Sequence, residues 1–158
     1  MEESAVTKAL FERYFIPTKK DRQKYVGIEI EMPIINLNAQ AVDFSVIHKL
    51  TDSFSKQFSM DPVNFDEEGN ICSLQDQITG DNLSYDCSYN NLELSLGKGI
   101  NINILHTRFN TYYSFIEGFL SNYHYTLTGL GINPYRKINH CVPILNEWYR
   151  MLFHYLNQ

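Results

Sequence analysis

The chain has 158 residues, of which 44% are hydrophobic and 14% aromatic, a composition that can bury one sizeable core and argues against a disordered polypeptide. Eighteen acidic against thirteen basic residues give a formal net charge of -5, so nucleic acid and anionic membranes are poor partners. The first residues lack a signal-peptide pattern, and no apolar run approaches the length that spans a membrane. We therefore expect one domain over residues 1–158.

The three cysteines are expected to be reduced thiols. Cys72, Cys87 and Cys141 form no Cys-x-x-Cys motif and are odd in number. Disulfides are rare in reducing compartments, so this usage predicts a cytoplasmic location.

Hydrophobic periodicity predicts three elements in the first third of the chain. Apolar residues four apart predict a short helix from Ser4 to Tyr14, ended by Pro17. From Tyr25 to Asn36 the pattern alternates, which predicts a strand. Asp43 is the expected N-cap of a second helix that Pro62 closes. The apolar stripe of this helix comprises Val46, Ile47, Leu50, Phe54 and Phe58.

The middle of the chain predicts an antiparallel meander. Short β-type runs at 63–65, 71–78 and 83–96 are separated by turn residues, and the run at 66–70 is one such turn. Gly97 and Gly99 are expected to break the chain before a long helix from Ile102 to Tyr123. A loop over 129–143 and a last helix from Ile144 onwards follow. The order predicts an α+β fold, with helices packed on one face of an antiparallel sheet.

Two pairs of acidic residues are candidate site residues. Glu29 and Glu31 lie two apart on the first strand, so their carboxylates share a face. A solvated sheet face and a divalent-cation site both explain that spacing, and spacing does not decide. Asp86 and Glu93 have an odd separation, but Asn90-Asn91 between them are turn residues. A bend that brings the two carboxylates together and a turn Asp with a separate surface Glu explain this pair equally well.

Four motifs together resemble the glutamate-cysteine ligase family. The strand at 26–31, Val-Gly-Ile-Glu-Ile-Glu, is similar to the opening strand of the family. Asp86-x-Ser88 followed by Leu92-Glu93-Leu94 resembles the next acidic segment, with the same seven-residue step from Asp to Glu. The loop at 128–134 and the helix at 147–155 resemble two later motifs in the same order.

The resemblance implies a glutamine synthetase-like half domain, the N-terminal portion of a glutamate-cysteine ligase catalytic domain. The family joins the γ-carboxylate of glutamate to the amine of cysteine with ATP and magnesium, the ligation of glutathione biosynthesis. It implies that Glu29, Glu31, Asp86 and Glu93 are metal ligands, because hard oxygen donors suit magnesium beside phosphates. It also implies that Arg136 and Tyr149 bind substrate, although Arg136 could equally lie on the surface.

The resemblance ends at Tyr155, whereas the family continues with further ligands. The sequence leaves two interpretations open: a part of a ligase that alone is a poor catalyst, or a non-catalytic binding or interaction module derived from that fold. Either one predicts apolar surface or an unpaired strand edge around residues 92–96 and 102–123. We therefore expect a homodimer, or association with the missing C-terminal part, unless the segment from Val6 to Tyr14 folds over the gap.

Overall fold

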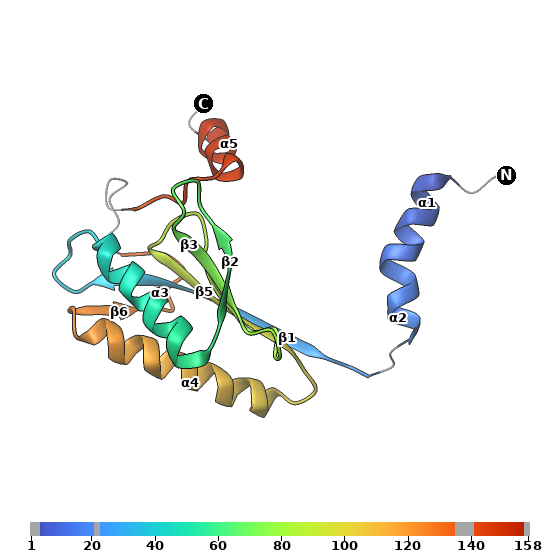
Figure 1. Cartoon of the computed structure of the whole chain (residues 1–158), viewed down its shortest axis with the longest axis horizontal. Coiled ribbons are helices and arrows are strands. Elements are labelled where there is room, and N and C mark those ends of the chain that lie inside the picture. Colours follow the sequence, from blue (N-terminus) through green and yellow to red (C-terminus); the bar gives the residue numbers. More distant parts are fainter. Residues whose placement is uncertain (1–3, 21–22, 135–140, 157–158) are drawn as a thin grey trace.

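The computed structural model describes residues 4–20, 23–134 and 141–156 and shows an α+β fold (Figure 1). Six strands form one antiparallel sheet in the order β2-β3-β4-β5-β1-β6. The strands are β1 (Val26–Asn36), β2 (Asp61–Phe65), β3 (Ile71–Gln75), β4 (Asn82–Tyr85), β5 (Asn91–Gly99) and β6 (Tyr125–Leu127). The predicted meander is confirmed, and β1 and β6 extend it at one side.

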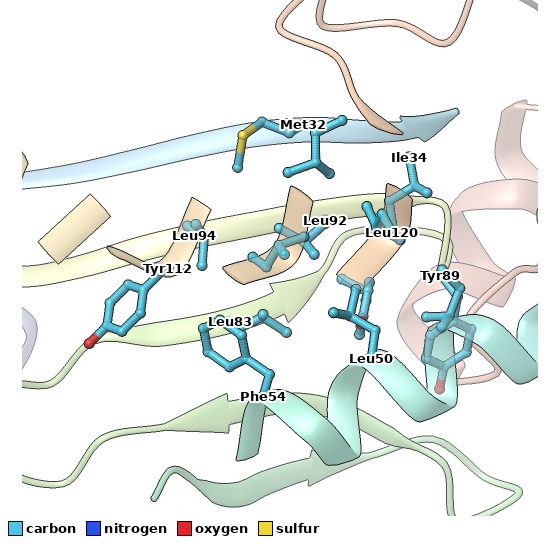
Figure 2. Close-up of a cluster of buried hydrophobic side chains, with 14 of the residues drawn as sticks. Met32, Ile34, Leu50, Phe54, Leu83, Tyr89, Leu92, Leu94, Tyr112 and Leu120 are labelled. Atoms are coloured by element: carbon cyan, nitrogen blue, oxygen red, sulfur yellow. The ribbon is translucent and has the colours of Figure 1, made fainter. Parts of the chain in front are cut away.

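Helices α3 (Phe44–Phe58) and α4 (Ile102–Ser121) cover one face of the sheet. Asp43 caps α3 as predicted, because its carboxylate accepts the N–H of Ser45 at 2.8 Å. Figure 2 shows strand residues facing α3 and α4 across a single core. The core residues it labels are Met32, Ile34, Leu50, Phe54, Leu83, Tyr89, Leu92, Leu94, Tyr112 and Leu120.

Pro62, Gly97 and Gly99 do not break elements in the way the sequence predicts. Helix α3 ends at Phe58 because Ser59 adopts a left-handed conformation, and Pro62 lies inside β2, on the edge of the sheet where a missing N–H is tolerated. Gly97 and Gly99 lie within β5 rather than after it. At Gly97 the strand passes against the backbone of Thr79 and Gly80, where a Cβ atom would collide. This glycine is therefore needed for close packing, not for a break.

The N-terminal helix is longer than predicted. It runs from Ala5 to Lys20 as α1 (Ala5–Leu10), the π-helical η1 (Phe11–Phe15) and α2 (Ile16–Lys20). Pro17 does not end it. A proline lacks the N–H that would donate to the preceding turn of an α-helix. The wider η1 turn ends two residues before Pro17. The helix stands apart from the sheet and does not fold over it (Figure 1).

The expected unpaired strand edge lies on a different strand. Residues 92–96 belong to β5, which is paired with β4 on one side and with β1 on the other. Among the described strands, β1 pairs with β5 along one side. Its other side pairs only at Ile34–Asn36, with the short strand β6, which the hydrophobic periodicity does not predict. The residues of β1 before Ile34 therefore form the open edge.

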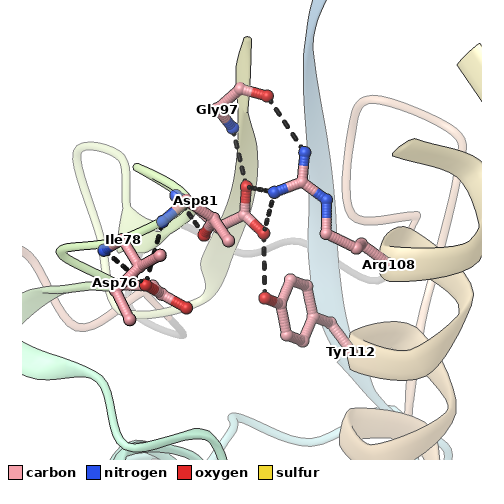
Figure 3. Close-up of polar contacts among 7 residues, drawn as sticks. Asp76, Ile78, Asp81, Gly97, Arg108 and Tyr112 are labelled. Atoms are coloured by element: carbon pink, nitrogen blue, oxygen red, sulfur yellow. Dashed lines mark hydrogen bonds and ion pairs between the residues drawn. The ribbon is translucent and has the colours of Figure 1, made fainter. Parts of the chain in front are cut away.

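A buried ion pair fastens the β3–β4 turn to α4 (Figure 3). Asp81 is fully buried and accepts from the guanidinium of Arg108 at 2.7 and 2.9 Å and from the hydroxyl of Tyr112 at 2.9 Å. The N–H of Gly97 donates to the same carboxylate at 2.8 Å. The network links the β3–β4 turn to β5 and α4, through residues that lie 16 to 31 positions after Asp81.

The last helix, α5 (Glu147–Leu156), begins three residues later than expected. The segment before it crosses the end of the sheet, where Ile144 is buried and its N–H donates to the carbonyl of Cys87 at 3.1 Å. Helices of the described residues are all too short or too polar to cross a membrane.

Candidate functional site

The face of the sheet opposite α3 and α4 carries polar side chains in cross-strand rows. Because strand residues alternate between faces, the partners of the acidic residues can be followed from strand to strand. One row runs Asn64, Ser73, Ser84, Glu93 and Glu31 across β2, β3, β4, β5 and β1. The next row runs Gln75, Asn82, Ser95 and Glu29. We call these nine residues the polar face.

Glu31 and Glu93 lie directly opposite each other on neighbouring strands. Antiparallel partners have Cα atoms roughly 4.5–5.5 Å apart, so the two carboxylates share one region of the polar face. Glu31 accepts from the side-chain amide of Asn91 at 3.3 Å, and Glu93 accepts from the hydroxyl of Ser95 at 2.6 Å. Glu29 is exposed two residues before Glu31. The expectation that Glu29 and Glu31 share a face is confirmed, and Glu93 lies on the same face.

Asp86 lies at the end of the polar face, where it lines the same cavity as Glu93. The turn between β4 and β5 closes with the N–H of Asp86 donating to the carbonyl of Asn91 at 3.0 Å. Cys87, inside this turn, has a left-handed backbone with φ of 58°. Asp86, Glu93 and Tyr149 line one cavity of about 330 Å³. The bend expected between Asp86 and Glu93 is therefore present.

Tyr149 on α5 contacts Asp86 directly. Its hydroxyl donates to the carboxylate of Asp86 at 2.9 Å. Burial raises the pKa of Tyr149 to about 12, and the hydrogen bond to the Asp86 carboxylate adds to that increase. This phenol therefore stays protonated at neutral pH and keeps Asp86 supplied with a donor. Its role in substrate binding stays a prediction.

Asp86 also lines a second, larger cavity of about 510 Å³. Asn90, Asn91 and Asn133 supply amide groups to this cavity, and Ile132 and Phe153 are among its apolar walls. The side-chain oxygen of Asn91 is buried without a hydrogen-bond partner in the described part of the protein. An acidic residue thus lies between a polar cavity and a largely apolar one.

The polar face has a donor set that fits a magnesium ion, without a preformed cluster. Within the described ranges no Lys, Arg or His side chain forms an ion pair with Glu29, Glu31 or Glu93. Opposed carboxylates repel unless a cation compensates them, and carboxylate oxygens are ligands that magnesium prefers. However, no group of three or more His, Cys, Asp or Glu side chains in those ranges is already gathered around one point. Side-chain rotation would be required to bring the ligands together.

Two results concern the other candidates. Arg136 lies outside the described residues, so its expected contact with substrate stays a prediction. The sequence pattern does not single out Ser84 and Ser95 as residues of the polar face. Ser84 lies on β4, Ser95 lies on β5 with Glu93, and each serine alternates with buried residues along its strand. That alternation is the signal that could have found them.

Comparison with known proteins finds no family model that matches this chain and no matching curated protein.

Proposed function

We propose that this chain carries the acidic, magnesium-binding face of a glutamate-cysteine ligase-type domain, which joins the γ-carboxylate of glutamate to the amine of cysteine with ATP. The carrying observation is the arrangement of Glu31 opposite Glu93 on an otherwise polar face, with Glu29 beside them and Asp86 at its end. In this proposal Glu29, Glu31, Glu93 and Asp86 hold the cation, which offsets the repulsion between phosphates and carboxylates during phosphoryl transfer.

The remaining parts of the proposal follow from this chemistry. Tyr149 orients Asp86 through its hydrogen bond, and glutamate, cysteine and ATP are the partners. The protein works in the cytoplasm as a homodimer, where ATP and magnesium are available and where Cys72, Cys87 and Cys141 stay reduced. These cysteines are not paired in disulfides. The glutamine synthetase-like relationship of the sheet belongs to the same proposal.

The alternative is a binding module that uses the same polar face without catalysis. The absence of a preformed metal cluster in the described ranges favours it, because a catalyst benefits from ligands that are already positioned. Both functions require the polar face to bind a divalent cation. They differ in whether a peptide-like bond is formed.

Manganese titration tests the shared requirement. Mn²⁺ replaces Mg²⁺ at oxygen sites and broadens the NMR signals of nearby amides, so signals of β1 and β5 should broaden before those of α3. Glu31→Gln and Glu93→Gln should each weaken Mn²⁺ binding about tenfold or more. Asp52→Asn, on the exposed side of α3, is the matched control and should leave the affinity unchanged.

The outcomes separate the proposals. Broadening centred elsewhere, or equal affinity in Glu31→Gln and the control, would contradict the cation site and both functions. Site-specific binding together with ATP-dependent formation of γ-glutamylcysteine supports the ligase. Binding without product, in the presence of all three substrates, favours the binding module.

A further inference from the structure

The N-terminal helix presents an apolar face that contacts nothing in its own subunit. We call residues 4–20 the arm helix. Every side chain described between Ser4 and Lys19 is exposed, and Tyr14 and Phe15 are 59% and 60% exposed. Val6, Leu10 and Phe11 belong to the same exposed apolar set. An isolated helix of this length is marginal in water, so its stability requires a surface to pack against.

The strand that follows the arm helix has an open edge. Residues 26–32 of β1 pair with β5 on one side, and in the described part of the chain no strand pairs with them on the other. Val26 is exposed, and Ile28 and Ile30 are only partly buried. A strand edge with unpaired backbone N–H and C=O groups and partly exposed apolar side chains is a template on which another strand can pair.

Charge indicates what covers the arm helix. It carries four basic residues, Lys8, Arg13, Lys19 and Lys20, against the single acidic Glu12, which is a charge of +3. Residues 23–158, which contain the folded body, carry eight basic and fourteen acidic residues, a net charge of -6. The helix is therefore attracted to the body of this same protein. An anionic lipid surface would attract the helix but repel the body.

We propose that two copies of this chain form a two-fold dimer in which their β1 edges pair antiparallel and each arm helix packs on the body of the other copy. Antiparallel pairing places the start of one β1 beside the end of the other, and so carries each arm helix towards the partner. This interface stands on the arm and the edge, and does not depend on the ligase chemistry.

An apolar surface is present where the arm helix would arrive. The N–H of Thr128 donates to the carbonyl of Pro33 at 3.0 Å, which fixes the following segment beside the end of β1. In that segment Leu130 and Ile132 are both 68% exposed. They offer an apolar contact for the aromatic face of an incoming helix, in a body of opposite charge.

Sedimentation equilibrium over a concentration series, combined with amide hydrogen exchange, tests this interface. We expect a monomer–dimer equilibrium in which amides of residues 26–32 exchange at least tenfold more slowly in the dimer. The double variant Leu10→Glu with Tyr14→Glu, and separately Val26→Lys, should each weaken dimerisation at least tenfold. Ile78→Glu, at a turn residue that is 96% exposed, is the matched control and should dimerise as the unmodified chain does.

Three results would overturn the proposal. A monomer at every concentration excludes it. A dimer that neither protects residues 26–32 nor responds to the arm variants uses another interface. A chain that stays monomeric in solution, but binds phosphatidylserine vesicles through an arm that Leu10→Glu with Tyr14→Glu abolishes, assigns the helix to lipid instead.

Discussion

At the scale of single residues, the most consequential charge is that of Asp81. It is fully buried and hydrogen-bonded to Arg108, Tyr112 and Gly97. Asp81→Asn would leave a largely buried guanidinium without its counter-charge, a change that typically costs about 3–5 kcal/mol. We expect a loss of this order in the free energy of unfolding from urea denaturation. Asp52→Asn, a half-exposed control on α3, should change it by less than about 0.5 kcal/mol. Equal stability of the two variants would contradict the buried network.

The Asp86–Tyr149 pair gives a prediction at the candidate site. The pKa of Tyr149 is raised to about 12, chiefly by burial and further by the carboxylate of Asp86. The group is neutral below its pKa, so its contribution to stability is present below the unfolded value of about 10 and is lost as pH rises towards 12. Asp86→Asn keeps the burial but removes the negative charge. The pKa should therefore fall part of the way towards 10.

NMR titration of ¹³C-labelled tyrosine measures this directly, with Tyr149→Phe identifying the signal. A Tyr149 signal that does not move in Asp86→Asn would show that the hydrogen bond is absent in solution.

At the scale of elements, the sequence predicts what depends on local pattern. Alternation predicts β1, the N-cap Asp43 predicts the start of α3, and apolar spacing predicts α4. The predictions fail where one residue type is compatible with two structures, or where an element is too short to show a pattern. Pro62 is expected to stop a helix but lies in an edge strand, and the three residues of β6 are too few for a period to be visible.

Gly97 is the clearest such case and can be tested with a matched glycine. A Cβ on Gly97 would collide with the backbone of Thr79, which cannot move like a side-chain end, so Gly97→Ala should lower the free energy of unfolding by about 1–3 kcal/mol. At Gly118, in α4, a Cβ atom would meet nothing within 4 Å. Gly118→Ala should stabilise the protein by about 0.8–1.0 kcal/mol, because alanine favours helix. Equal effects in urea denaturation would contradict the close approach at Gly97.

At the scale of the whole molecule, the candidate site is predictable in part. Alternation puts Glu29 and Glu31 on one face, and turn chemistry anticipates the return from Asp86 to Glu93. Which strands lie side by side is not predictable, because β1 joins β5 across 58 to 73 positions of sequence, through a register that no local pattern encodes. Because strand order is not encoded locally, the open edge is expected near residues 92–96 but lies on β1. For the same reason the ion pair between Asp81 and Arg108 is not predicted.

Removal of the arm helix tests how stability is distributed over the molecule. The buried apolar residues lie between Met32 and Ile144, and no side chain described from Ser4 to Lys19 is buried. A chain that starts at Gln23 should therefore unfold at low concentration with the same free energy as the full chain, within about 0.5 kcal/mol. A dimer adds stability in proportion to the logarithm of concentration, so the melting temperature of the full chain should rise with concentration. Without the arm helix that rise should move to at least tenfold higher concentration, because only the β1 edges remain to pair. A truncated chain that is less stable even when dilute would show that the helix packs on its own subunit.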